Sequence, residues 1–132
     1  MTIHVRYLSQ VIVRMNFEDS LDEQMKEELE RCVKEQVDNA KKQLFYLIDL
    51  NNYQDKKELE SLGEAISEEL AKHGNVIGEV AILSNKKFKI KQKEVSKKVK
   101  FFSEDFKAQS HLSDASRFGF LDEISLKSLQ DR

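Results

Sequence analysis

Two groups of polar residues each lie at the end of an apolar run of the sequence. The first group is Asp49, Asn51, Asn52 and Asp55, and the second is Ser84, Asn85, Lys86 and Lys87. If both runs are parallel strands, their carboxyl ends meet at the edge where open α/β sheets bind ligands. Amide, carboxylate and lysine groups there could bind a phosphorylated or polar partner. Asn and Asp are equally the residues that turns require, and no glycine-rich phosphate cradle accompanies them.

Lysine dominates the segment that follows. Beyond Lys86 and Lys87, the residues that would form a basic face are Lys89, Lys91, Lys93, Lys97, Lys98 and Lys100, interrupted by the single acid Glu94. Apolar residues between Phe88 and Phe106 recur at helical spacing, which predicts an amphipathic helix over 88–107 with the lysines on its exposed face. Such a face is either simply solvated or docks on something acidic, including residues 18–38 of a second copy.

Three kinds of acidic partner would suit that basic face: nucleic acid, anionic lipid headgroups and an acidic protein surface. Nucleic acid is disfavoured, because the lysine segment contains no arginine, no nucleic-acid-reading motif is present and the pI is about 6.0. Two candidate partners therefore remain: a protein, and an anionic membrane surface to which the chain would bind without inserting.

The sequence contains no clear catalytic motif. Ser110, His111 and Asp114 are the residue types of a hydrolytic triad, but they lie too close in sequence to face one another in order, and no nucleophile elbow is present. His4, His73 and His111 are dispersed along the sequence, with no cysteine or acidic partner at metal-ligand spacing, which disfavours a zinc site. The sequence predicts that the protein is not an enzyme and that it holds no metal or cofactor.

Composition is that of one folded domain. The 132 residues suit a single domain over 1–132, and 35% of them are charged against 39% that are hydrophobic. No run approaches the roughly 20 apolar residues that cross a bilayer, and the first residues lack the features of a signal peptide. The lone cysteine, Cys32, suits a reducing compartment. A cytoplasmic location is expected.

The elements that must position these residues begin with the most apolar run, 43–50, which predicts a central strand buried on both faces. Alternating residues over 3–7 and 11–17 predict an antiparallel hairpin. Ser20 and Glu23 have the spacing of a capping box and predict the start of a first helix.

A second helix is predicted to begin at an Asp55 cap and to end at Gly74. Gly63 lies on the buried side of this helix, where we expect a close approach to the sheet to compensate for the cost of a mid-helix glycine.

The remaining predicted elements are a strand at 79–84, the lysine-rich helix, a loop at 108–116, a short strand at 117–120 and a closing helix at 122–129. The alternation of strands and helices predicts the α/β class. We expect a mixed sheet of about five strands, with an N-terminal antiparallel hairpin followed by parallel strands and with helices packed on the sheet.

This order of elements resembles the STAS or SpoIIAA-like domain, the anti-sigma-factor antagonist fold, along nearly the whole chain. The central strand ends in Ile48-Asp49-Leu50, and Phe118-Gly119-Phe120 precedes the last helix. The resemblance implies a regulatory domain whose phosphoacceptor serine lies in an Asp-Ser-Ser-Gly turn at the start of the second helix. The corresponding stretch here, 51–57, contains no serine or threonine, and the first is Ser61.

Two functions are therefore expected from the sequence. The first is a non-enzymatic, STAS-like regulatory or protein-interaction module that lacks the phosphorylatable serine and acts on a protein partner, with a homodimer as a further option. The alternative is a small lipid- or phosphate-binding protein that uses the lysine-rich helix.

Overall fold

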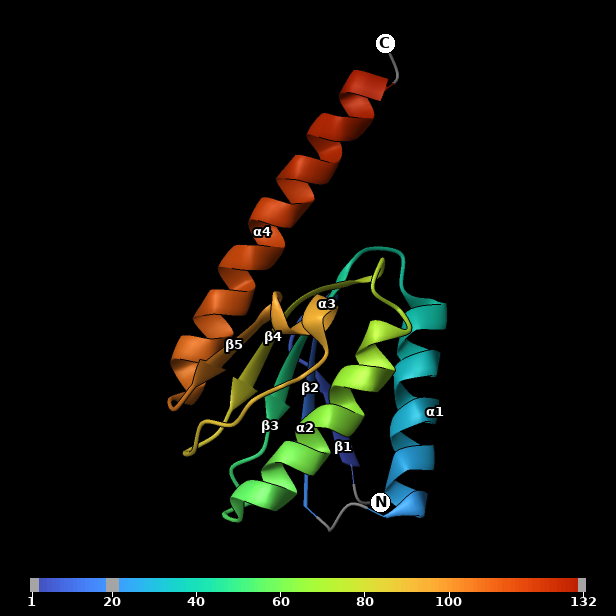
Figure 1. Ribbon diagram of the computed structural model, residues 1–132. Helices are drawn as coiled ribbons and strands as arrows, with labels where there is room; N and C mark the ends of the chain where they lie inside the picture. The colour runs from blue at the N-terminus through green and yellow to red at the C-terminus, as the bar shows by residue number, and fades with distance from the viewer. Residues whose placement is uncertain (1–2, 19–21, 131–132) are drawn as a thin grey trace.

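The computed structural model describes residues 3–18 and 22–130, with the side chains of all of these except 93, 94 and 118–130. After two consecutive strands, helices and strands alternate along this part of the chain (Figure 1). The strands are β1 (Ile3–Tyr7), β2 (Ile12–Phe17), β3 (Leu44–Asp49), β4 (Ile77–Leu83) and β5 (Val99–Phe102). The helices are α1 (Glu23–Asn39), α2 (Lys56–Ala71), α3 (Lys93–Ser96) and α4 (Asp105–Gln130).

The strands form one mixed sheet in the order β1-β2-β3-β4-β5. β1 and β2 are antiparallel, and the other neighbouring pairs are parallel. A parallel pair needs a long return connection, and each of these connections contains a helix. The predicted fold class, an α/β mixed sheet with an N-terminal antiparallel hairpin, parallel strands and packed helices, is confirmed.

β3 lies in the middle of the sheet and is buried on both faces, as predicted. Leu44, Tyr46 and Ile48 belong to the core on one face, whereas Phe45 and Leu47 belong to the core on the other. None of these five side chains is more than 4% exposed. Because both faces of the strand are apolar, each face needs its own covering layer.

α1 and α2 cover the first face and complete the larger core. Both helices begin at a side-chain cap. The Asp22 carboxylate accepts a hydrogen bond from the Met25 amide at 2.8 Å, and Asp55 accepts one from the Lys57 amide at 3.2 Å. The Asp55 cap was predicted; Ser20 of the predicted capping box lies outside the described residues.

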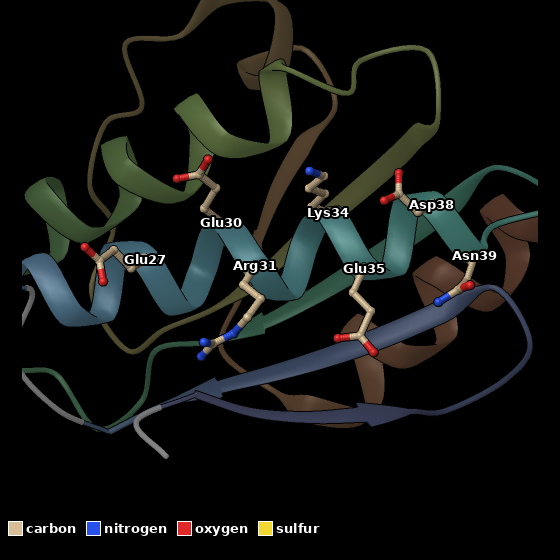
Figure 2. A pocket seen from close by; sticks show the side chains of 7 residues that line it. All are labelled: Glu27, Glu30, Arg31, Lys34, Glu35, Asp38 and Asn39. Carbon is tan, nitrogen blue, oxygen red and sulfur yellow. The ribbon is translucent and has the colours of Figure 1, made fainter.

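The outer face of α1 is strongly charged. Glu27, Glu30, Arg31, Lys34, Glu35, Asp38 and Asn39 line a shallow surface depression there. Figure 2 shows Glu30 and Lys34 pointing toward α2, while Arg31 and Glu35 point toward the β1–β2 hairpin.

The first turns of α4 cover the opposite face of the sheet. Ala108 and Leu112 are fully buried and pack with a core of Ile12, Phe45, Leu47, Ala81 and Leu83. Beyond this contact α4 continues past the edge of the sheet, as Figure 1 shows. The second layer over β3 is therefore one end of a single helix.

The predicted lysine-rich helix over 88–107 is wrong. Residues 85–92 form an irregular connection, followed by the single turn of α3 and then by β5. Phe88, Val95 and Phe101 do reach the larger core, but they reach it from a loop, a turn and a strand. A helix would have stacked lysines one turn apart, which is unfavourable, whereas pairing with β4 satisfies the backbone of β5.

The predicted loop at 108–116 and strand at 117–120 are also wrong, because both segments belong to α4. The closing helix predicted at 122–129 is the end of the same helix. Ala108, Leu112 and Ala115 have helical spacing and face the smaller core, but the polar residues between them obscured that pattern.

Gly63 makes a close approach, but to a different group from the one predicted. A Cβ at Gly63 would overlap the Phe88 ring rather than the sheet. Phe88 is 5% exposed and packs edge-on against Phe101 with ring centroids 5.2 Å apart. The missing side chain at Gly63 therefore lets the 85–92 connection pack directly against the surface of α2. Gly74 lies beyond the end of α2, whose C-cap is Lys72.

Gly63→Ala should lower the free energy of unfolding by about 1 to 3 kcal/mol, the usual cost of overpacking, even though alanine favours a helix more than glycine does. Urea denaturation measures this change. Gly74→Ala is the matched control, because its Cβ would lie 3.6 Å from the Ala71 carbonyl oxygen, an ordinary contact. A Gly63→Ala protein as stable as wild type would contradict the packing described.

Candidate functional site

The two predicted groups of polar residues do meet in space. Asp49 and Leu83 are paired in register at the carboxyl ends of β3 and β4, and the Leu50 amide donates to the Leu83 carbonyl at 2.9 Å. The Lys86 ammonium then donates to the Gln54 carbonyl at 2.8 Å, which joins the two loops. We call this surface the polar rim; it comprises Asp49, Asn51, Asn52, Asp55, Ser84, Asn85, Lys86 and Lys87.

Some rim residues build the loops. Ser84 is 7% exposed. Its hydroxyl donates a hydrogen bond to the Lys86 carbonyl at 2.9 Å and accepts one from the Lys86 amide at 3.2 Å. Asp55 caps α2, and the Asp49 carboxylate accepts from the Asn51 amide at 3.0 Å. These side chains fix the loop backbones, in agreement with the turn-forming role that the sequence left open.

The other rim residues face outward. Asn52, Asn85, Lys86 and Lys87 are exposed. Asn52 also donates to the Phe17 carbonyl at 3.2 Å, which ties the β3–α2 loop to the end of β2. Amide and ammonium groups are thus presented on loops whose backbones are held by hydrogen bonds.

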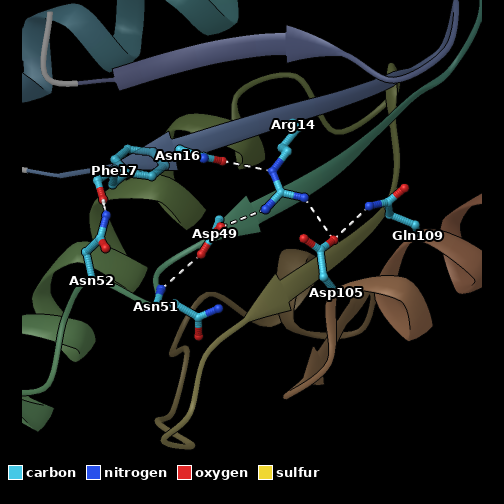
Figure 3. A network of polar contacts seen from close by, with 8 residues as sticks. All are labelled: Arg14, Asn16, Phe17, Asp49, Asn51, Asn52, Asp105 and Gln109. Carbon is cyan, nitrogen blue, oxygen red and sulfur yellow. Dashed lines mark hydrogen bonds and ion pairs between the residues drawn. The ribbon is translucent and has the colours of Figure 1, made fainter.

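Arg14 is the polar residue that sequence reasoning missed. Its guanidinium donates to Asp49 at 2.7 Å and to Asp105 at 2.8 Å, and its Nε donates to the Asn16 amide oxygen at 3.0 Å (Figure 3). Gln109 donates to the same Asp105 carboxylate at 2.8 Å. Arg14 therefore connects β2, β3 and the first turn of α4 directly behind the rim.

A signal for Arg14 was present in the strand pattern. Val13, Met15 and Phe17 are completely buried on one face of β2, so Ile12, Arg14 and Asn16 must share the other. An arginine on a covered face requires an acidic partner, and Asp49 is the one acid of the neighbouring apolar run. The Asp49 side chain is 17% exposed, so its pair with Arg14 is largely covered.

The ion pair changes the titration of both partners. The hydrogen bond from Arg14 lowers the pKa of Asp105 below its ordinary value of 3.8, against the opposing effect of partial burial. The bond to Asp105 is also the largest of the effects that raise the pKa of Arg14. Both groups are therefore charged across the neutral range.

The lysines of the predicted basic face have different environments wherever their side chains are described. Lys98 donates to the Gly74 and Ile77 carbonyls at 2.8 and 2.9 Å and has a structural role. Lys91 lies 3.4 Å from Glu64 of α2. Lys89 and Lys97 are exposed on the connection and the turn, and Lys100 is exposed on β5. The side chain of Lys93 lies outside the described ones.

Ser110, His111 and Asp114, the residue types of a hydrolytic triad, have separate environments on α4. His111 contacts Glu79 of β4 and packs against the Phe102 ring at a centroid distance of 5.3 Å. Ser110 and Asp114 are exposed on α4. Among the side chains that the structure describes, no three His, Cys, Asp or Glu residues gather as metal ligands would.

No protein-family model matches this sequence, and no curated protein matches it either. Across the described residues, no helix combines the length and apolar character needed to cross a membrane.

Arg14→Leu should lower the free energy of unfolding by about 2 to 3 kcal/mol, because it leaves Asp49 and Asp105 without their shared cation. Thermal or urea denaturation measures the loss. Arg6→Leu is the matched control: Arg6 is exposed on β1 directly opposite Arg14, and its loss should change stability by less than about 0.5 kcal/mol. Equal effects of the two substitutions would argue against the network.

The lowered pKa of Asp105 also predicts a pH dependence. Its contribution to stability is fully present above the unfolded value, near 3.8, and is lost as the pH falls through the lower folded pKa. The effect should be modest, since the Asp105 side chain is 45% exposed. Melting temperatures of wild type and Asp105→Asn should differ at neutral pH and converge in acid. A constant difference down to the acid limit would contradict this assignment.

Proposed function

We propose that this protein is a non-enzymatic, STAS-like regulatory or protein-interaction module that binds a protein partner through the polar rim. The observation that carries the proposal is the Lys86–Gln54 hydrogen bond, which holds two loops side by side. Asn52, Asn85 and Lys87 are thereby exposed on a preorganised frame. Preorganised groups lose little conformational entropy on binding.

The STAS-like character rests on the element order and on the position of the rim at the start of α2. In that family the corresponding turn carries a phosphorylatable serine. Residues 51–57 here have no hydroxyl other than that of Tyr53, which is 6% exposed. We propose a constitutive binding surface that a partner kinase does not switch, in a protein of the cytoplasm.

The non-enzymatic part of the proposal is supported by the state of the reactive groups. The Ser84 hydroxyl is engaged with the loop backbone. Burial, followed by the charge of Glu28, raises the pKa of the Cys32 thiol and so disfavours the nucleophilic thiolate. Neither residue is activated for attack.

Lys87→Glu should weaken capture of the partner from lysate of the source cell by about tenfold or more, while the melting temperature stays unchanged because Lys87 is exposed. Quantitative mass spectrometry compares proteins retained on wild-type and variant baits. Lys97→Glu is the matched control, since it makes the same charge change on an exposed lysine outside the rim.

The same pair of variants tests the lipid- or phosphate-binding alternative. That function predicts binding to anionic vesicles at low salt, and this binding should weaken as the salt concentration rises. Lys87→Glu and Lys97→Glu should reduce the vesicle binding equally. Vesicle binding with equal losses would overturn the rim proposal. The rim proposal would be supported if a protein that the wild-type bait retains is lost with Lys87→Glu but not with Lys97→Glu.

A further inference from the structure

β1 lies at one edge of the sheet. Within the described residues it pairs only with β2. The Leu8 amide donates to the Ile12 carbonyl at 2.9 Å, which makes Leu8 and Ile12 a hydrogen-bonded pair next to Tyr7 and Val13. Hydrogen-bonded and non-hydrogen-bonded pairs alternate in an antiparallel ladder. The amides and carbonyls of Ile3, Val5 and Tyr7 therefore point away from β2, along the free edge.

The same residues expose apolar side chains beside that edge. Val5 is 37% exposed and Tyr7 is 50% exposed, two of the three large hydrophobic side chains that are exposed in the described part of the chain. They share a sheet face with their partners Met15 and Val13, which belong to the larger core under α1. Free backbone groups and apolar surface thus coincide on β1, which is the combination that favours strand addition.

We propose that β1 pairs antiparallel with β1 of a second copy of this chain, about a two-fold axis at Val5. The outward-pointing residues are symmetric about Val5, so Val5 would face its counterpart and Ile3 would face Tyr7 of the partner. Every outward amide would then find a carbonyl, and the exposed parts of Val5 and Tyr7 would become cross-strand contacts. The two sheets would become one continuous sheet.

The charges on α1 favour the same partner. Arg31 and Glu35 lie one turn apart and point toward the β1–β2 hairpin (Figure 2). Burial raises the pKa of Tyr7, and the charge of Glu35 raises it further, which indicates that Glu35 lies near this strand. A two-fold axis runs the two α1 helices in opposite directions, so Arg31 of each copy would approach Glu35 of the other. The surface is complementary to itself.

The opposite edge of the sheet is a poor alternative. A two-fold pairing of β5, whose sequence is Val-Lys-Phe-Phe, would bring Lys100 near its own counterpart, and like charges across strands are unfavourable. Pairing of β1 with β5 of another copy is a heterologous contact, which would generate a ring or an open chain of molecules rather than a two-fold dimer.

Sedimentation velocity of the full chain, from about 1 to about 100 µM, tests the proposal. Wild type should show a monomer–dimer equilibrium. Val5→Lys places two ammonium groups at the axis and should raise the dissociation constant by about tenfold or more, with an unchanged circular dichroism spectrum. Lys100→Glu, on the other edge, should leave the dissociation constant unchanged.

A charge exchange tests the helix contact independently. Arg31→Glu and Glu35→Arg should each weaken the dimer, and the combined variant should restore it, because the opposite charges face each other again. A monomer at every concentration would overturn the proposal and leave β1 a solvated edge. A dimer insensitive to Val5→Lys, or an open series of oligomers, would also overturn it.

Discussion

β3 needs cover on both of its faces, and much of the molecule follows from that requirement. Its alternate side chains enter two separate cores, and the strand would expose apolar surface to water if either core were missing. α1 and α2 supply one layer with two long apolar stripes. The other layer comes from α4, and among its described side chains only Ala108 and Leu112 are fully buried. Polar contacts must therefore help to hold α4 in place.

The Arg14 guanidinium supplies the main polar contact. Because it binds Asp49 on β3 and Asp105 on α4 together, it sets the position of the helix relative to the strand ends. Asp49 in turn accepts from the Asn51 amide and begins the loop of the polar rim. The rim and the second layer thus share one charged group, and the contact between His111 and Glu79 fixes α4 at a second point along β4. Geometry at the rim depends on the docking of α4.

The two interaction surfaces that we propose lie on different parts of the sheet. The polar rim is at the carboxyl ends of β3 and β4, whereas the proposed dimer uses the free edge of β1. A second copy on β1 leaves the rim loops uncovered, so a dimer would present two rims to a partner. Two rims would increase avidity for a partner that is itself repeated.

The sequence by itself determined the central strand, the hairpin, both long helices of the first layer and the meeting of the two polar groups. Each of these follows from local periodicity or from the direction of parallel strands. It misassigned the segments between 88 and 120, whereas the helix predicted at 122–129 is part of α4. The error over 88–100 arose because lysines at every second or third position suit a helix face and an exposed loop equally well. Only the tertiary structure decided those elements: pairing with β4 made 99–102 a strand, and the uncovered face of β3 required a helix from 105 onward. Arg14 likewise gained its role only through folding, since Asp49 and Asp105 lie far from it in the chain and the fold brings both carboxylates to one cation.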